Sequence, residues 1–221
     1  MTRFYIDLEF IERGHKHPIE LISIGIVSED GREFYAVSTE FNPRHASQWV
    51  KDNVIACLPK RYVGHPMDGG GSPRLFEEAK AWKSRSQIRD GIARFVGYER
   101  HATQSNRHGL LGLWDRLVGR QEVKYTAKSS DDFPEFFGEW CAYDHITFCQ
   151  IFGTMMDLPQ GFPMRTRDII QTAEDELGIP SDRLPPSLET DGNHNALLGA
   201  RTVKMRYDWL QEQKANRFKS A

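Results

Sequence analysis

The chain has 221 residues, of which 39% are hydrophobic and 27% charged, with a formal net charge of −2. These values fit one ordinary globular domain, and no apolar run approaches the roughly 18 residues needed to span a membrane. The start of the chain lacks a secretory pattern, and its three cysteines suggest neither a disulfide framework nor a cysteine-rich zinc site, so we expect a cytoplasmic protein without membrane partners.

Three strands are expected at the start of the chain. RFYIDLEF, from Arg3 to about Glu9, mixes β-branched and aromatic residues with acids. IELISIGIVS (19–28) is an almost continuous apolar run, as in a strand buried on both faces. The turn signal EDG leads into REFYAVST (32–39). We therefore predict an antiparallel meander with a loop, IERGHKHP, between the first two strands.

Two helices are expected next. Ser47 is a suitable N-cap for a short helix, and SRSQIRDGIARFVG (84–97) has apolar residues at helical spacing with Ser84 or Ser86 as its cap. Between these helices, the glycine-rich composition of 60–75 predicts a flexible loop.

A basic insertion is expected at about 99–131, which is polar and glycine-spotted apart from GLLGLWDRLVG, a segment that predicts one short helix. Much of it falls within residues 60–128, which carry a net charge of +7, whereas residues 1–59 carry −3 and residues 129–221 carry −6. The basic segment is either an electrostatic footprint for a polyanion or a solvated, arginine-rich surface.

The last part of the chain is predicted to alternate between strand and helix. EFFGEWCAYDHITFCQIFGTM predicts a strand to Ala142 and a helix after Asp144. TRDIIQTAEDELG (166–178) predicts an amphipathic helix, and a loop then leads to a final helix from His194 to about Gln213. This order predicts a single mixed α/β domain over residues 1–221. The sequence has no dinucleotide fingerprint, phosphate loop or nucleophile elbow.

Two acids on the first strand are candidate metal ligands. Asp7 and Glu9 are two residues apart, so on a strand their carboxylates point to the same face. Their mutual repulsion is relieved if a divalent cation binds between oxygen ligands. The pattern alone favours a simpler alternative, an exposed edge strand that carries two acids.

Asp144 and His194 have simple explanations when each is taken alone. Asp144 lies at the predicted junction of strand and helix, where aspartate often serves as an N-cap. A single histidine near a helix start, such as His194, is more often a hydrogen-bonded structural residue than a base. The ordered set of D-x-E, a later aspartate and a histidine before the last helix is more specific than any member of it.

With the segments YIDLEF, PIELISIG, AYDHITFCQIFG and HNALLGAR in this order, the chain resembles the DEDDh 3′–5′ exonucleases of the ribonuclease H-like superfamily. It is most similar to the small bacterial and phage ribonuclease T-like exoribonucleases. The resemblance implies a ribonuclease H-like mixed sheet, antiparallel in its first three strands and flanked by helices. It also implies a homodimer that acts on single-stranded RNA or an RNA 3′ overhang, although no residue distinguishes RNA from DNA.

The resemblance also implies roles for individual residues. Two divalent cations, Mg²⁺ or Mn²⁺, would be bound about 4 Å apart by Asp7, Glu9 and Asp144, with Asp7 bridging both. His194 would take the proton from the attacking water, and nucleoside 5′-monophosphates would be released from the 3′ end. Leu8 and Phe10 would help to place the terminal nucleotide.

The chain departs from the family pattern at Gly199. The pattern His-x-Ala-x-x-Asp-Ala has its fourth acid there, and glycine offers no side-chain ligand while costing up to about 1 kcal/mol in a helix. Three interpretations follow: a weakened or inactive exonuclease, a degenerate member that binds a 3′ end or a partner without cutting, or rescue by a nearby acid, Asp191 or Glu189.

The leading hypothesis is a metal-dependent 3′–5′ exoribonuclease with weakened catalysis. The alternative is a non-catalytic nucleic-acid-binding module on the same fold, and a third possibility is a structural protein with incidental acids.

Overall fold

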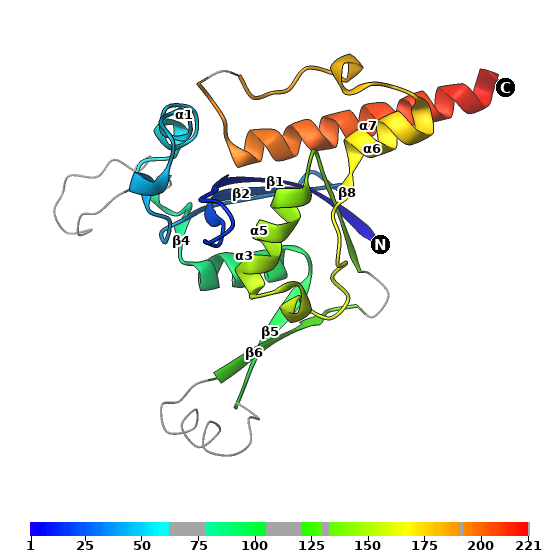
Figure 1. Ribbon diagram of the computed structural model, residues 1–221. Coiled ribbons are helices and arrows are strands. Elements are labelled where there is room, and N and C mark those ends of the chain that lie inside the picture. The colour runs from blue at the N-terminus through cyan, green and yellow to red at the C-terminus, as the bar shows by residue number, and fades with distance from the viewer. Residues whose placement is uncertain (62–77, 105–120, 130–132, 191, 221) are drawn as a thin grey trace.

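The computed structural model describes residues 1–61, 78–104, 121–129, 133–190 and 192–220, and its centre is a six-stranded sheet flanked by helices (Figure 1). The strand order is β4-β3-β2-β1-β7-β8, with antiparallel pairing between β1, β2 and β3 and parallel pairing elsewhere. The strands of this sheet are β1 (Thr2–Ile11), β2 (Glu20–Ser28), β3 (Glu33–Ser38), β4 (Trp82–Lys83), β7 (Pro134–Gly138) and β8 (Arg167–Asp168). The predicted mixed α/β class with an antiparallel first half is confirmed.

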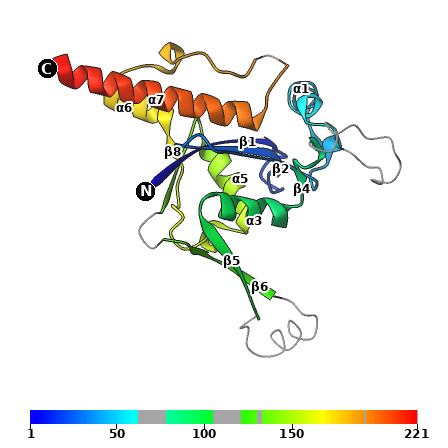
Figure 2. The ribbon, with the colours of Figure 1, turned by 180° about the vertical axis from the view of Figure 1, so that it is seen from behind.

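Five α-helices and four short 3-10 turns complete the elements around the sheet in the part of the chain that is described. The helices are α1 (Gln48–Asn53), α3 (Arg85–Phe95), α5 (Ala142–Phe152), α6 (Ile169–Leu177) and α7 (Ala196–Ser220). The 3-10 turns are η1 (Pro43–His45), η2 (Ile55–Cys57), η3 (Met155–Asp157) and η4 (Ser181–Arg183). In both ribbon views α6 and α7 lie on one side of the sheet and α3 and α5 on the other (Figures 1 and 2).

The predicted meander forms with its expected turn. Gly31 has a φ of +85°, a conformation that glycine adopts without steric cost, and it closes the turn between β2 and β3. Asp7 on β1 pairs with Gly25 on β2, and the register shifts after Glu9, so that Glu9 pairs with Ser23 but Phe10 pairs with Leu21. Such a bulge increases the local twist of the sheet directly beside the two acids.

Alternation along β1 assigns its side chains to two cores. One core contains Phe4, Ile6 and Leu8 together with buried residues of α3 and α5. The other contains Tyr5, whose ring centroid lies 5.2 Å from that of Tyr207 on α7. Because side chains two residues apart share a face, Asp7 and Glu9 project toward α7.

Helix α7 begins very close to the sheet, and Gly25 makes this possible. A Cβ atom at Gly25 would lie 2.1 Å from the carbonyl oxygen of Ala196 and 2.6 Å from the Cα of Leu197. Any other residue on β2 at this point would push the start of α7 away from the sheet. The start of the last helix is therefore in close backbone contact with β2, at the residue that pairs with Asp7 of β1.

The junction between β7 and α5 differs from the sequence prediction. The strand ends at Gly138, four residues before the predicted Ala142, and α5 begins at Ala142. Between them Trp140 has a positive φ of 47°, which reverses the chain, and the Cys141 N–H donates a 3.2 Å hydrogen bond to Asp168. Asp144 consequently lies within the first turn of α5 and is not its N-cap.

The caps expected for α1 and α3 form, whereas α7 continues to Ser220, beyond the expected end at about Gln213. Ser47 caps α1 by accepting a hydrogen bond from the Val50 N–H, and Ser84 caps α3 with a complete capping box. Gly178 ends α6 in the left-handed conformation, although the helix itself begins at Ile169 because Arg167–Asp168 joins the sheet. Below α1 lies a small separate core made of four buried residues, Ile11, Ile22, Ala46 and Val54.

The segment predicted as an insertion at 99–131 contains strands that were not predicted. Strands β5 (Tyr98–Gln104) and β6 (Gln121–Ala127) pair antiparallel as a separate two-stranded sheet. The short helix expected in GLLGLWDRLVG, and most of the loop expected at 60–75, lie outside the described residues. Within those that are described, no helix is long and apolar enough to cross a membrane.

Candidate active site

The acids of β1 lie where the sheet meets α7. Asp7 and Glu9 share the face that α7 covers, while the two side chains expected to place a nucleotide lie on the opposite face. Leu8 is 4% exposed and belongs to the core, so its side chain is not available to a substrate in this arrangement. Phe10 is partly buried and its ring stacks on Tyr143 of α5, with centroids 6.0 Å apart.

Asp144 is brought to β1 by the first turn of α5. Its Oδ1 atom accepts a 2.9 Å hydrogen bond from the backbone N–H of Leu8, the residue between the two acids of β1. The side chain is buried, with 8% of its surface exposed. The start of α5 is fixed through Asp168, which binds the Cys141 N–H and also caps α6. The third acid is therefore positioned by two helices and one strand.

His194 lies two residues before α7 rather than inside it. Its backbone N–H donates a 2.9 Å hydrogen bond to the Asn53 carbonyl at the end of α1, and its ring contacts Trp49 with centroids 4.9 Å apart. The next residue, Asn195, accepts a hydrogen bond from the Leu197 N–H through its side chain. The histidine is thus held between α1 and the start of α7.

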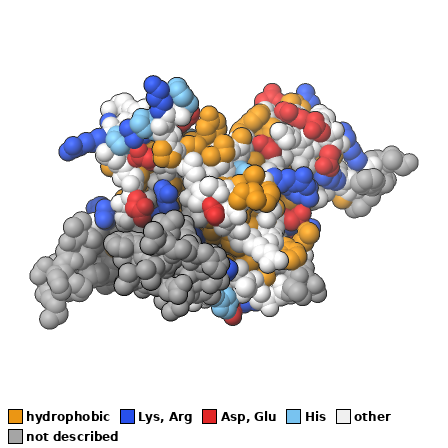
Figure 3. Space-filling view, turned by 60° about the horizontal axis from the view of Figure 1, so that its bottom comes forward, with side chains coloured by type: hydrophobic (Ala, Val, Ile, Leu, Met, Phe, Trp, Pro, Cys, Tyr) orange, Lys and Arg blue, Asp and Glu red, His pale blue; other side chains and the backbone are white. Residues whose placement is uncertain are grey.

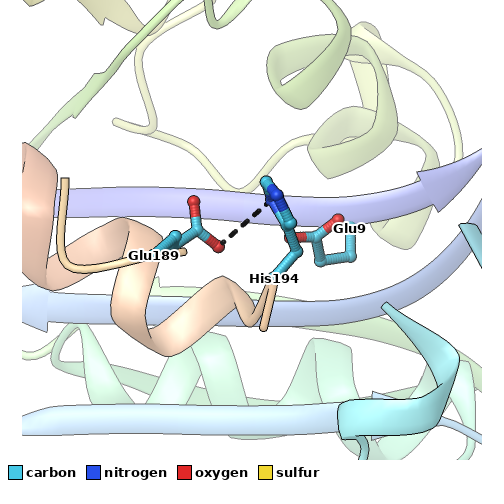
Figure 4. A group of neighbouring side chains, drawn as sticks. All are labelled: Glu9, Glu189 and His194. Carbon is cyan, nitrogen blue, oxygen red and sulfur yellow. Dashed lines mark ion pairs between the residues drawn. The ribbon is translucent and has the colours of Figure 1, made fainter. Parts of the chain in front are cut away.

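A further acid, Glu189, reaches the same place from the loop before α7. One ligand atom each from Glu9, Glu189 and His194 lie within 4.8 Å of one another, the only such group of three in the part of the chain that the structure describes (Figure 4). The His194 Nδ1 atom is 3.9 Å from the Glu189 Oε1 atom. Asp191, the other acid considered for rescue, is outside the described residues.

Burial disfavours the charged form of all four carboxylates, and neighbouring carboxylates further disfavour it in Asp7 and Glu9. Burial, then Asp144 and Glu9, raise the pKa of Asp7 well above its usual value. Burial, followed by Glu189 and Asp144, raises the pKa of Glu9 to about 8. Burial raises the pKa of Asp144 to about 6, and burial also raises the pKa of Glu189.

These carboxylates have little positive charge nearby. Over the described ranges, no lysine or arginine forms an ion pair with Asp7, Glu9, Asp144 or Glu189. Buried negative charges of this kind are normally paired or bound to a metal. A donor set of carboxylate oxygens fits a divalent cation such as Mg²⁺ or Mn²⁺.

The structure also explains why a glycine occupies position 199. A Cβ atom there would lie 2.3 Å from the Asp7 Oδ2 atom and 2.9 Å from the Asp7 Cβ atom. Position 199 therefore faces Asp7 of β1, which is where the resemblance would place a fourth acid. In this chain the Asp7 side chain fills the space beside position 199, so a larger residue there would require that side chain to move, and glycine avoids the collision despite its helix penalty.

Sequence reasoning placed three acids and a histidine, and the structure brings all four to one place. Glu189 was named only as a possible rescuer, because a lone glutamate in an irregular loop carries no pattern. Its location depends on how the loop is tied to α7, which is not visible in the local sequence.

No family model matches the chain. Two curated proteins are similar to it over most of its length, each named 3′-5′ exoribonuclease, from Mycobacterium tuberculosis strains CDC 1551 / Oshkosh and ATCC 25618 / H37Rv. Each is 35% identical over 206 residues, which cover 93% of this chain and 90% of the relative.

Proposed function

The chain belongs to the family of these mycobacterial 3′–5′ exoribonucleases, and we propose that it is itself a metal-dependent 3′–5′ exoribonuclease that releases nucleoside 5′-monophosphates. The observation that carries the proposal is the convergence of Asp7, Glu9 and Asp144 beside His194. These residues come from one strand and two other segments far apart in the chain. The simple explanation that each has when taken alone does not account for their meeting at one place.

Asp7, Glu9 and Asp144 would hold two divalent cations, Mg²⁺ or Mn²⁺. When bound, such ions stabilise the charge that develops on the attacking and leaving oxygens of a phosphodiester. Among the described residues, no lysine or arginine forms an ion pair with the three acids, which supports this assignment. An arginine or lysine in that place would compete with the cation for the same oxygen atoms.

His194 is proposed as the general base. It accepts the proton of a water molecule, whose oxygen attacks the last phosphorus of the strand while the bond to the 3′ oxygen of the preceding nucleotide breaks. The products are a nucleoside 5′-monophosphate and an RNA one nucleotide shorter with a free 3′ hydroxyl. The backbone hydrogen bond to Asn53 keeps the imidazole beside Glu9 without occupying a ring nitrogen.

Aromatic side chains on both sides of the site suit the bases of a single strand. Trp49 is 55% exposed beside His194, and Tyr143 is 45% exposed beside Asp144. Hydrophobic side chains gather along the middle of the face drawn in Figure 3, beside a notch in the surface. Base stacking on exposed rings contributes about 1–3 kcal/mol per base and does not depend on sequence. Because Phe10 lies on the opposite face and stacks on Tyr143, the exposed Tyr143 ring would take the role in placing the terminal nucleotide that was expected of Phe10.

The proposal is tested with 5′-labelled single-stranded RNA in Mn²⁺ or Mg²⁺. We expect a ladder that shortens one nucleotide at a time, with nucleoside 5′-monophosphates detected by chromatography. His194→Ala and Asp144→Asn should each reduce the rate by at least about 100-fold, in line with the loss of a general base or a ligand. A single-stranded DNA of the same sequence measures the preference for RNA.

The alternative, a nucleic-acid-binding module that does not cut, is favoured by the missing acid at position 199. It predicts that the chain binds labelled RNA but leaves its length unchanged in both metals, and this result would overturn the exoribonuclease proposal. Gly199→Asp is a poor test of either idea, because the new side chain would collide with Asp7. The homodimer and the cytoplasmic location expected from the sequence stay predictions.

A further inference from the structure

The proposed metal site has an acid from the loop before α7, Glu189, in addition to those of β1 and α5. In this chain the position on α7 that faces Asp7 is Gly199, which has no side chain to bind a cation. A carboxylate nevertheless lies beside Glu9, and it comes from the loop before α7. We propose that Glu189 supplies the fourth carboxylate of the metal site in place of a side chain at position 199. This inference rests on the proposed exoribonuclease function.

The loop that carries Glu189 is fastened to α7. Thr202, which is buried, accepts a 3.0 Å hydrogen bond from the Leu188 N–H through its hydroxyl oxygen and donates a 3.0 Å bond to the Leu198 carbonyl. The Glu189 N–H donates to the Ser187 hydroxyl. The backbone beside the glutamate is therefore tied to the same helix turn that contains position 199.

The side chain of Glu189 is also held in place. Its Oε1 atom accepts a 2.8 Å hydrogen bond from the Asn195 N–H, just before the first turn of α7. This bond fixes the carboxylate on the side of the loop that faces Glu9 and His194 (Figure 4). A mobile surface glutamate would have no such anchor, and a metal ligand requires one because cations tolerate poor geometry badly.

A purely structural role does not account for the charge. A glutamine would accept the same hydrogen bond from Asn195 without placing a second negative charge beside Glu9. The ion pair with His194 explains the charge only in part, because its 3.9 Å between Nδ1 and Oε1 is longer than a hydrogen bond and it leaves the position beside Glu9 unexplained. A cation shared with Glu9 explains both the charge and its position.

Gly199 and Glu189 are complementary features of one arrangement. Glycine at position 199 leaves the space beside α7 to the Asp7 side chain, with which a Cβ atom there would collide. The loop then delivers a carboxylate to the neighbouring edge of the same site. A chain that lacks an acid at position 199 can in this way retain four carboxylates around the site, namely Asp7, Glu9, Asp144 and Glu189.

The test is Mn²⁺ titration of the full-length protein by calorimetry, with Glu189→Gln as the variant. Glutamine keeps the acceptor for Asn195 and removes only the charge. We expect Mn²⁺ affinity to fall at least about tenfold, since even indirect supports of a metal site are worth 10–100-fold. Glu174→Gln on the exposed side of α6 is the matched control and should bind Mn²⁺ like the unmodified protein. Thermal melts in EDTA establish that each variant is folded.

The outcomes separate this inference from the proposed function. If Glu189→Gln binds Mn²⁺ within twofold of the unmodified protein, the assignment of Glu189 is wrong, even if its activity falls. If the unmodified protein degrades RNA and Glu9→Gln does not, the proposed function stands whichever result Glu189→Gln gives. If the unmodified protein neither binds Mn²⁺ nor shortens RNA, both proposals fail. Loss of Mn²⁺ affinity in Glu189→Gln, with the control unchanged, supports the fourth ligand.

Discussion

Replacing Glu9 with glutamine should stabilise the protein when metal is absent. Burial, Glu189 and Asp144 raise the pKa of Glu9 from 4.5 to about 8. A carboxyl group whose pKa is raised on folding stabilises the fold fully below its unfolded pKa, and this contribution is lost as the pH rises through the folded value. The metal-free protein should therefore lose stability between about pH 4.5 and pH 8, and Glu9→Gln should remove this part of the loss.

The size of the effect follows from the same pKa values. Each pKa unit corresponds to about 1.36 kcal/mol, so ionising Glu9 costs the folded state up to about 3 kcal/mol at pH 7 and up to about 5 kcal/mol well above pH 8. Near pH 4 the difference between the two proteins should almost vanish. For a chain of this length, 3 kcal/mol corresponds to roughly 6–12 °C in melting temperature.

Urea unfolding in EDTA at pH 5 and pH 8, followed by tryptophan fluorescence, measures the effect. We expect Glu9→Gln to have the higher free energy of unfolding at pH 8, and the gap between the proteins to shrink at pH 5. Mn²⁺ should reverse the order, because only the unmodified protein retains that ligand. A variant that is no more stable than the unmodified protein at pH 8, or a gap that does not change with pH, would refute this account of the charges.

Three further outcomes are expected. Gly25→Ala should destabilise the fold by about 3 kcal/mol in urea unfolding, because its methyl group would collide with the Ala196 carbonyl; an unchanged midpoint would mean that α7 can move away freely. Asp168→Ala should cost about 2 kcal/mol and also slow RNA degradation, because it removes the cap of α6 and the bond to Cys141 that sets the turn carrying Asp144. Dialysis against EDTA should abolish RNA degradation and added Mn²⁺ should restore it, whereas full activity in excess EDTA would exclude the metal.

Features that depend on neighbouring residues could be predicted from the sequence. The period of two in β1, the apolar run of β2 and the serines that cap α1 and α3 act within a few residues of chain. These signals gave the meander and the class of the fold. Asp7 and Glu9 share a face for the same reason, so the first half of the candidate site also followed from local geometry.

Features that depend on partners far away in the chain could not be predicted from the sequence. The aromatic residues before Asp144 favour a strand, but the chain reverses at Trp140 and is held there by Asp168, which lies 27 residues beyond Cys141. Strands β5 and β6 stabilise each other by pairing, although they are far apart in the sequence. Neither the residue periodicity nor the composition of one strand indicates its partner. The polar character of each strand alone therefore suggested an insertion.

Position 199 shows both what a sequence motif can predict and what only the folded structure reveals. The ordered motif around His194 predicts that Gly199 stands where the family pattern has an acid, and this stays a prediction. The close contact between α7 and β1, and the carboxylate delivered by Glu189, arise only when the loop and helix are folded together. Weakened catalysis was inferred from the first fact without the second, and it stays a prediction.

The small core beneath α1 has a consequence for how the site opens. It contains only Ile11, Ile22, Ala46 and Val54 as buried members, and it is separate from the two larger cores. Small clusters open locally far more often than the whole molecule unfolds. The amide of His194 is bonded to Asn53 in this region, so its hydrogen exchange should follow α1, whereas the amides of β1 beside Asp7 should exchange only with global unfolding. If the amide of His194 exchanges faster than those of β1, the proposed base and the acids belong to different cooperative units, and the fraction of molecules with a complete site is set by the weaker one.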